Sequence, residues 1–209
     1  SNLVLFVDEK FSIGGLKKHI SNSEFSYILD LLKNSDLKKD LLVFEINSKK
    51  TIFLTSIKKD IKTSDIESLG AKFHSYIDYD KKKDYFINSD TINSEIKNFV
   101  GYFLHGIKLK SYEFNIYKSK KEKKIVYINV IGNKNKISTQ DHLRFKAIEE
   151  GSFFARDLVS EPGNILHPDE YAKRINSLKK FGLKINIYDE KKLKKLGMNA
   201  LLGAGQGSI

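Results

Sequence analysis

The chain has 209 residues, a mass of 24.0 kDa and no cysteine, which excludes disulfide scaffolds, thiolate zinc sites and cysteine nucleophiles. Hydrophobic residues make up 40% of the chain, enough for a packed core, and no apolar run reaches the ~18 residues that a membrane-spanning helix needs. The net charge is +11, but it comes almost entirely from lysine, so we interpret the basicity as a solvated surface. No secretory signal is visible, and the absence of cysteine suits a reducing cytosol, so we expect a cytoplasmic protein with no membrane partner.

Strand-like and helix-like segments alternate over the first ~135 residues. The predicted strands cover residues 3–7, 41–46, 51–57, 84–88, 112–117 and 125–131. Two helices are predicted to begin at capping boxes, Ser21 with Glu24 and Ser64 with Glu67, and a third covers 92–105. This alternation predicts a three-layer α/β domain with a mainly parallel sheet over residues 1–138.

A single long helix is predicted to connect this domain to the rest of the chain, over residues 139–161. Apolar residues spaced three or four apart define one face of about 22 residues: Leu143, Ala147, Gly151, Phe154 and Leu158. The only prolines in the chain follow it directly. Pro162 cannot continue the helix, and Pro168 stands where a new helix begins.

Residues 162–209 are predicted to be the first elements of a second α/β domain. Tyr171, Ile175 and Leu178 indicate a helix, 183–187 alternates as a strand, and a short helix runs from Asp189. Elements this few cannot bury a core of their own, so we expect this domain to be incomplete.

No residue is predicted to be catalytic, to bind a cofactor or to hold a metal. The histidines, His19, His74, His105, His142 and His167, lack zinc-helix spacing. Asp78 and Asp80, beside Lys81–Lys83, are interpreted as a solvated loop, and the lysines between 118 and 124 as a solubilising turn. The glycines of 203–207 lack the spacing of a dinucleotide-binding loop, and we predict a close-packed turn there.

The segment 154–208 nevertheless resembles the junction of the leucyl (cytosol) aminopeptidase family, where the inter-domain helix enters the catalytic domain. The resemblance rests on ARDLVSEPGN (155–164), LHPDEYA (166–172) and GAGQGS (203–208). Upstream, it rests on Gly106, Leu109, Tyr112, Phe114, Tyr117 and Lys118. Two residues depart from the family pattern: Ser160 replaces a common asparagine, and His167 replaces a threonine that would cap the next helix better.

The resemblance implies that the chain is the N-terminal part of a hydrolase that removes N-terminal residues, leucine above all, from peptides. Such proteins are similar in using two divalent ions, manganese or zinc, whose ligands would lie beyond residue 209. The chain alone is therefore expected to bind neither metal and to be inactive. The resemblance also implies a cytosolic homohexamer.

A second hypothesis comes from a different class of protein. Some bacterial members of the family resemble DNA-binding architectural proteins, and residues 1–138 carry a net charge of +8, from 25 basic and 17 acidic residues. A basic DNA-binding module without peptidase activity is therefore the alternative, and its binding would weaken steeply with added salt.

Overall fold

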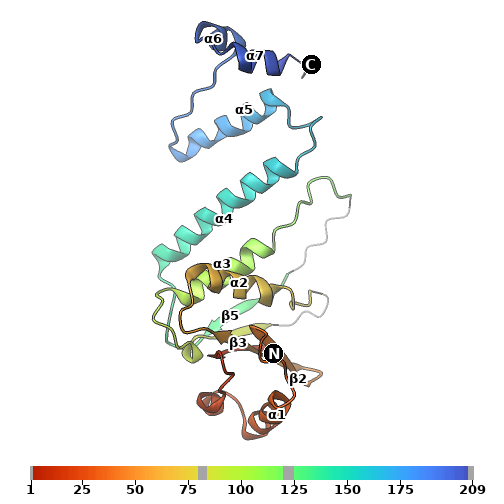
Figure 1. Cartoon of the computed structure of the whole chain (residues 1–209), viewed down its shortest axis with the longest axis vertical. Helices are drawn as coiled ribbons and strands as arrows, with labels where there is room; N and C mark the ends of the chain where they lie inside the picture. The colour runs from red at the N-terminus through yellow and green to blue at the C-terminus, as the bar shows by residue number, and fades with distance from the viewer. Residues whose placement is uncertain (1, 80–83, 120–124, 207–209) are drawn as a thin grey trace. The chain divides into compact units, whose positions relative to one another are not determined.

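A computed structural model describes residues 2–79, 84–119 and 125–206 of the chain (Figure 1). The chain folds into two compact units, residues 1–154 and 155–209. The division falls within α4 (Thr139–Ser160), the long helix that the sequence predicts. That this helix joins two domains, with boundaries at 138 and 161, stays a prediction.

The first unit is built on a five-stranded sheet in the order β2-β3-β1-β4-β5. Its strands are β1 (Asn2–Asp8), β2 (Leu41–Asn47), β3 (Lys50–Ile57), β4 (Tyr85–Asn88) and β5 (Ile128–Ile131). Only the hairpin of β2 with β3 is antiparallel, whereas β1 runs parallel to both β3 and β4, and β4 runs parallel to β5. The predicted mainly parallel sheet is confirmed.

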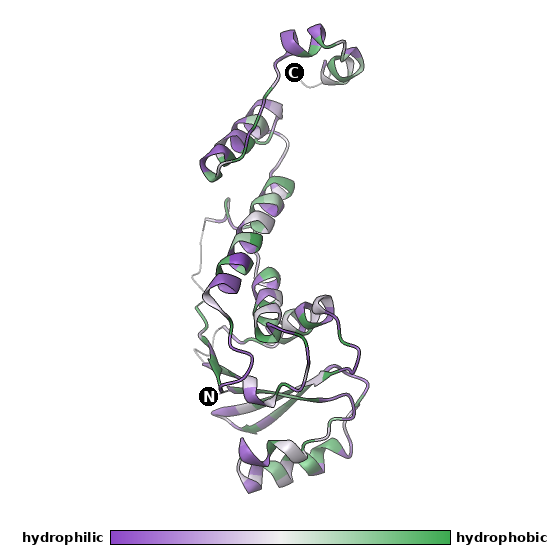
Figure 2. Cartoon of the chain, turned by 90° about the vertical axis from the view of Figure 1, so that its left-hand side faces the viewer, coloured by the Kyte–Doolittle hydropathy of each residue, from purple (hydrophilic) through white to green (hydrophobic). Residues whose placement is uncertain are grey.

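Helices cover both faces of this sheet, which confirms the three-layer α/β prediction. One face carries the short η1 (Gly14–Lys18) and α1 (Asn22–Leu32), and the other carries α2 (Thr63–His74) and α3 (Phe99–Lys110). Figures 1 and 2 show α1 on the opposite side of the sheet from the α2–α3 pair. A single-turn helix, η2 (Ser89–Thr91), follows β4.

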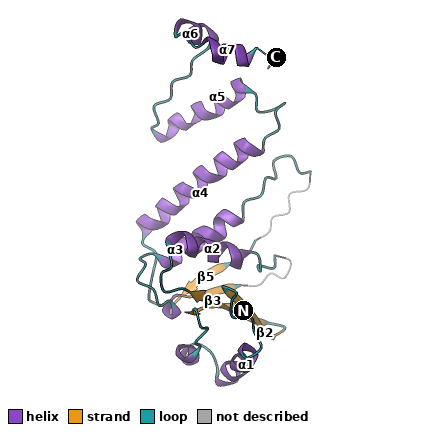
Figure 3. Cartoon of the chain, viewed as in Figure 1, coloured by secondary structure: helices purple, strands orange, loops and turns teal. Residues whose placement is uncertain are grey.

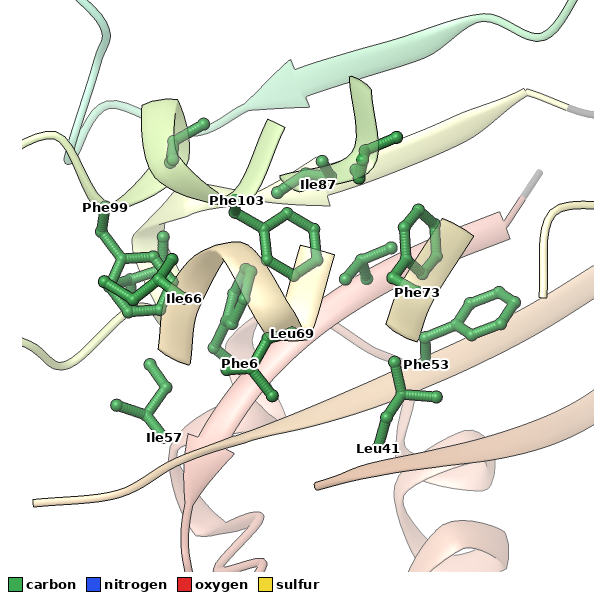
Figure 4. Close-up of a cluster of buried hydrophobic side chains, with 14 of the residues drawn as sticks. Phe6, Leu41, Phe53, Ile57, Ile66, Leu69, Phe73, Ile87, Phe99 and Phe103 are labelled. Carbon is green, nitrogen blue, oxygen red and sulfur yellow. The ribbon is translucent and has the colours of Figure 1, made fainter. Parts of the chain in front are cut away.

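Strand β1 contributes to both cores because its side chains alternate between the faces. Val4 and Phe6 enter the cluster under α2 and α3, whereas Leu5 and Val7 enter the cluster under α1. In the larger cluster, the Phe6 ring lies edge-on to the Phe103 ring, with centroids 5.3 Å apart (Figure 4). Burial on both faces explains why this strand reads as a continuous apolar run.

The two predicted capping boxes have different outcomes. At α1 the prediction is confirmed: Ser21 Oγ accepts the N–H of Glu24, and Glu24 Oε2 accepts the N–H of Ser21. At α2 the prediction is wrong, because the helix begins at Thr63 and the Asp65 carboxylate accepts the N–H of Lys62. The Asp65 carboxylate satisfies the free N–H of the residue before the helix, but the Lys62 side chain has no acceptor, so only this half of a capping box forms.

Helix α3 begins at Phe99, seven residues after the predicted start at Ile92. The residue before it, Asn98, has a left-handed backbone (φ 60°), which cannot belong to a right-handed helix. Residues 92–98 therefore form an irregular connection instead of a helical turn. The helix also runs on to Lys110, beyond the predicted end at His105.

The predicted strand over 112–117 is wrong, and the one over 125–131 is too long. Residues 112–117 form a loop and a turn (Figure 3), in which the N–H of Lys118 donates to the carbonyl of Asn115. A strand needs a hydrogen-bonded neighbour, and residues 128–131 pair with β4. Just before them, the Tyr127 carbonyl accepts the N–H of Tyr85 on β4, but 125–127 do not form a strand. Val130 and Ile131 on β5 remain partly exposed.

Helix α4 has the predicted length but a different buried face. Leu143 is 60% exposed, whereas Phe145 is 6% exposed and packs on α3. A Cβ at Gly101 would lie 2.5 Å from the Phe145 ring, so this glycine makes room for the ring. Glu149, one turn further along α4, lies 3.1 Å from Nδ1 of the buried His105. Tertiary packing therefore selects a face that the apolar spacing does not indicate.

After the last turns of α4, the second unit consists of short helices whose side chains stay largely exposed. They are α5 (Pro168–Asn176), η3 (Ser177–Phe181), α6 (Glu190–Lys195) and α7 (Asn199–Gly205). Pro168 opens α5 as predicted, and the His167 side chain makes no capping hydrogen bond. Asp189 caps α6 as its side chain accepts the N–H of Lys192.

Two predictions in this unit are wrong. Residues 183–187 form no strand, and no strand to pair with them lies among the described residues of the unit. Gly203 and Gly205 belong to α7 instead of a close-packed turn, and a Cβ at either position would meet nothing within 4 Å. Residues 207–209 lie outside the described residues.

No helix in the described part of the chain is long and apolar enough to cross a membrane.

Helices α2 and α3 approach so closely that their backbones touch at two glycines. A Cβ on Gly70 would lie 2.0 Å from the Phe103 carbonyl oxygen, and one on Gly106 would lie 1.9 Å from the Glu67 carbonyl oxygen. We predict that Gly70→Ala and Gly106→Ala each lower the free energy of unfolding by about 1–3 kcal/mol, because a backbone must move. Urea unfolding measures this.

The matched control is Gly151→Ala in α4, where a Cβ meets nothing within 4 Å. Alanine favours a helix over glycine by about 1 kcal/mol, so this variant is expected to be as stable as the wild type or more so. Equal losses at all three glycines would contradict the close-approach argument.

The attachment of α4 to α3 is tested at Phe145. We predict that Phe145→Ala costs about 3 kcal/mol in the free energy of unfolding of the first unit, because it empties a buried, ring-sized space. Leu143→Ala, two residues away on the exposed side, is expected to change it by less than about 0.5 kcal/mol. Thermal or urea unfolding of both variants measures the two changes. A similar loss of stability in Phe145→Ala and Leu143→Ala would show that Phe145 does not attach α4 to α3.

Candidate functional site: a crevice at the carboxyl edge of the sheet

A cavity of about 890 Å³ lies at the carboxyl ends of the parallel strands in the first unit. Its walls come from the segments after β1, β3 and β4, that is from residues 8–19, 57–61 and 90–96. After β1 the chain passes to α1 on one face of the sheet, and after β3 it passes to α2 on the other. Such a switch point is where α/β sheets bind ligands.

The wall after β1 is folded around the Asp8 carboxylate. Its Oδ1 accepts the N–H groups of Lys10 (3.0 Å) and Ser12 (2.9 Å). Between them, the buried Phe11 has a left-handed backbone with φ 55°. The hydrogen bond from the Ser12 N–H lowers the pKa of Asp8 below its ordinary value, so this side chain stays ionised.

The wall after β4 carries a second carboxylate held in the same way. Asp90 Oδ1 accepts the N–H groups of Asn133 (2.8 Å) and Lys134 (3.0 Å), which follow β5. These bonds, that of Asn133 first, lower the pKa of Asp90 below its ordinary value of 3.8. Asp8 and Asp90 thus place two ionised groups on the same cavity from neighbouring strands.

Uncharged side chains hold the two walls together. Thr91 Oγ1 accepts the N–H of Phe6 on β1 (2.9 Å) and donates to the Asn88 carbonyl (2.8 Å). The Asn88 side-chain amide lies 3.0 Å from Nδ1 of His19, so it donates and the imidazole accepts. The cavity walls are therefore fixed by hydrogen bonds between elements, not only by the strands.

The histidines singled out from the sequence are scattered across the chain. His19 lines the cavity, His105 is buried under α4, and His74 bonds through Nε2 to the Tyr79 hydroxyl at 2.6 Å. Burial lowers the pKa of His74. His142 and His167 are exposed. Among the described residues, no three His, Asp or Glu side chains gather closely enough to hold a metal ion.

The charged segments singled out from the sequence do not join the cavity. Asp80 and Lys81–Lys83 lie outside the described residues, as do the lysines of 120–124, while Lys118 is exposed. The backbone N–H of Asp78 donates to the Tyr85 hydroxyl at 2.9 Å. Sequence reasoning missed the cavity residues Asp8 and Asp90. The available signal was a carboxylate within two residues of the end of each of two predicted parallel strands.

At the junction motif, the second unit contains a partly buried ion pair. Glu161, directly after α4, has a side chain only 1% exposed, and its carboxylate lies 2.7 Å from the Arg174 guanidinium of α5. Arg174 also bonds to Glu170 at 3.1 Å. The pair fixes the turn through Pro162 and Gly163, so the EPG sequence has a structural role here.

The pH dependence of stability tests the two backbone hydrogen bonds that Asp90 accepts from Asn133 and Lys134, which we call the Asp90 clamp. The clamp forms only on folding, so the lowered pKa stabilises the folded chain above the ordinary value of 3.8, and this stabilisation disappears as the pH falls through the lowered value. Asp90→Asn keeps the accepting Oδ1 but lacks the charge. We expect wild type to be the more stable at pH 7 in urea unfolding, and the difference to shrink below pH 3.8 and to vanish once the pH has fallen through the lowered pKa of Asp90. A difference that is constant with pH would contradict the clamp.

Comparison with known proteins gives the family context. Residues 153–209 match the family model "Cytosol aminopeptidase family, catalytic domain". A probable cytosol aminopeptidase of Nitrobacter winogradskyi is 31% identical over 99% of this chain and 44% of its own length. One from Phytoplasma mali is 41% identical over 57% of this chain and 24% of its own length. The chain thus spans less than half the length of these relatives.

Solved structures share the fold. A tomato leucine aminopeptidase mutant superposes with a TM-score of 0.71 at 18% identity, over 94% of this chain and 43% of that chain. The cytosol aminopeptidase from Coxiella burnetii superposes with a TM-score of 0.64 at 13% identity, over 92% of this chain and 38% of that chain. With the family model on its last 57 residues and a relative matched over nearly all of it, the chain belongs to the cytosol aminopeptidase family.

Proposed function

We propose that this chain forms the N-terminal part of a cytosolic metallo-aminopeptidase that removes N-terminal residues from peptides, with a preference for leucine. The observation that supports this most directly is the match of residues 153–209 to the family's catalytic domain. The 31% identical relative extends the match through the first unit. The alternative of a DNA-binding module is not supported by these relatives.

The two units differ in whether they have a hydrophobic core of their own, and this difference supports the proposal. Residues 1–154 form a compact α/β unit with its own two-sided core. Within the second unit, the described residues 155–206 bury no large apolar side chain, and Phe181, Leu183 and Leu201 are each more than half exposed. Because apolar side chains are stabilised by burial, we expect the remainder of a catalytic domain to cover this unit.

In the whole protein, two divalent ions, manganese or zinc, would supply an activated water and polarise the scissile carbonyl. The described residues do not fit such a centre, because no three possible ligands come together. We therefore assign no residue of this chain to the metals, and the chain alone is expected to be inactive. We further propose a homohexamer.

The proposal is tested by adding the missing part. We predict that the 209-residue chain does not hydrolyse leucine p-nitroanilide in manganese. A chimera that joins it to the remaining part of the Nitrobacter winogradskyi relative is expected to hydrolyse this substrate, to lose activity on chelation and to regain it with manganese or zinc.

The full-length relative is the positive control for the assay. Hydrolysis by the 209-residue chain would disprove its predicted inactivity. A chimera that folds, as judged by circular dichroism and a cooperative thermal transition, yet stays inactive would argue against the enzymatic proposal.

A further inference from the structure

The crevice at the carboxyl edge of the sheet has no part in the proposed hydrolysis, yet it is built like a binding site. It is about 890 Å³ in volume, within the range of about 300–1,000 Å³ typical of small-molecule sites. Its position at the switch point between β1 and β3 is set by the topology and not by a loose surface loop. We propose that it binds a small organic ammonium ion with an apolar side chain, namely a free amino acid or the N-terminus of a peptide.

The two fixed carboxylates are the acceptors for the ammonium group. In both Asp8 and Asp90, Oδ1 accepts the two backbone N–H groups that orient the side chain. The Ser12 hydroxyl also bonds to the Asp8 carboxylate, and a carboxylate has about four lone-pair sites, so each group keeps capacity to accept from a ligand. Both side chains line the cavity. An ammonium group has three N–H donors, and its hydrogen bonds to carboxylates are charge-assisted.

The charge of the lining favours a cation, in contrast to the chain as a whole. The chain carries +11, but the cavity is lined by five carboxylates and three lysines. One of these lysines, Lys58, lies 3.3 Å from the carboxylate of Asp40, which does not line the cavity. The crevice is therefore a locally acidic region on a basic protein, and the surplus carboxylates attract a positive group.

The choice of an organic ammonium ion over a metal ion follows from the number of ligands. The described residues gather no group of three His, Asp or Glu that could hold a metal, whereas two carboxylates oriented by backbone N–H groups, Asp8 and Asp90, line the cavity. Two acceptors are sufficient for an ammonium group that also binds through its carbon body.

The apolar part of the lining would hold that body. Leu16 comes from the segment after β1, Ile57 and Ile61 come from the end of β3 and its continuation, and Ile96 comes from the segment before α3. An aliphatic side chain that contacts them loses water-exposed surface, at about 25 cal/mol per Å². Leucine combines such a side chain with an ammonium group, and its choice as the probe rests on the proposed function.

Isothermal titration of the 209-residue chain tests the proposal without any need for catalysis. The ligands are L-leucine, leucylglycine, 3-methylbutylamine, which lacks the carboxylate, and 4-methylpentanoate, which lacks the ammonium group. We expect the first three, at millimolar concentrations, to bind more tightly than the last. Leucine binding tighter than leucylglycine identifies a free amino acid as the ligand, and the reverse order identifies a peptide N-terminus.

Charge-removing variants locate the site. Asp8→Asn and Asp90→Asn keep the Oδ1 acceptor that orients each loop, and each is expected to weaken leucine binding about tenfold. Asp30→Asn is the control, because Asp30 is an exposed α1 residue paired with Lys33 and does not line the cavity. Amide chemical shifts in 8–19, 57–61 and 90–96 report both the fold of each variant and the place of binding.

Three outcomes would overturn the proposal. They are no binding of any ammonium ligand to the folded chain, equal binding of 4-methylpentanoate and leucine, and equal weakening by the control and the two crevice variants. None of these bears on the peptidase assay of the chimera, so failure of the crevice proposal and failure of the proposed function are distinguishable.

Discussion

Burial of β1 on both faces is the constraint on which the first unit depends. This strand pairs with β3 on one side and β4 on the other, so its backbone is satisfied by the sheet and its side chains fill two cores. Because all three strands run parallel, their carboxyl ends meet at one edge. The crevice, its two carboxylates and its apolar lining all follow from that alignment.

The core on the α2–α3 face of the sheet depends on a second constraint, the close contact of α2 with α3. Gly70 and Gly106 bring the two backbones together, which places the aromatic side chains of both helices on β1 and β3. On the outer side of α3, Gly101 and His105 receive Phe145 and Glu149 of α4. The layers of the unit are thus joined by local fits between small and large residues, and α4 is part of this packing up to residue 153.

The sequence predicted correctly those features that depend on residues close together in the chain, and it failed for those that depend on tertiary contacts. The buried run of β1 and the capping box at Ser21 are set by neighbouring residues, and both predictions were confirmed. The alternation of 112–117 satisfies the same local rule, but no strand among the described residues pairs with this segment, so the prediction failed. The apolar spacing of α4 named Leu143, whereas packing against α3 buries Phe145. The crevice combines segments some 80 residues apart, which no window of sequence reveals.

The clamp on Asp90 also acts as a tether for the long helix. Asn133 and Lys134 are bound to this carboxylate, and α4 begins five residues after Lys134. An extended chain covers at most about 3.6 Å per residue, so Thr139, the first residue of α4, stays within about 18 Å of Lys134. The Asp90 side chain therefore has two roles: it lines the crevice, and it limits how far the start of α4 can move from the sheet.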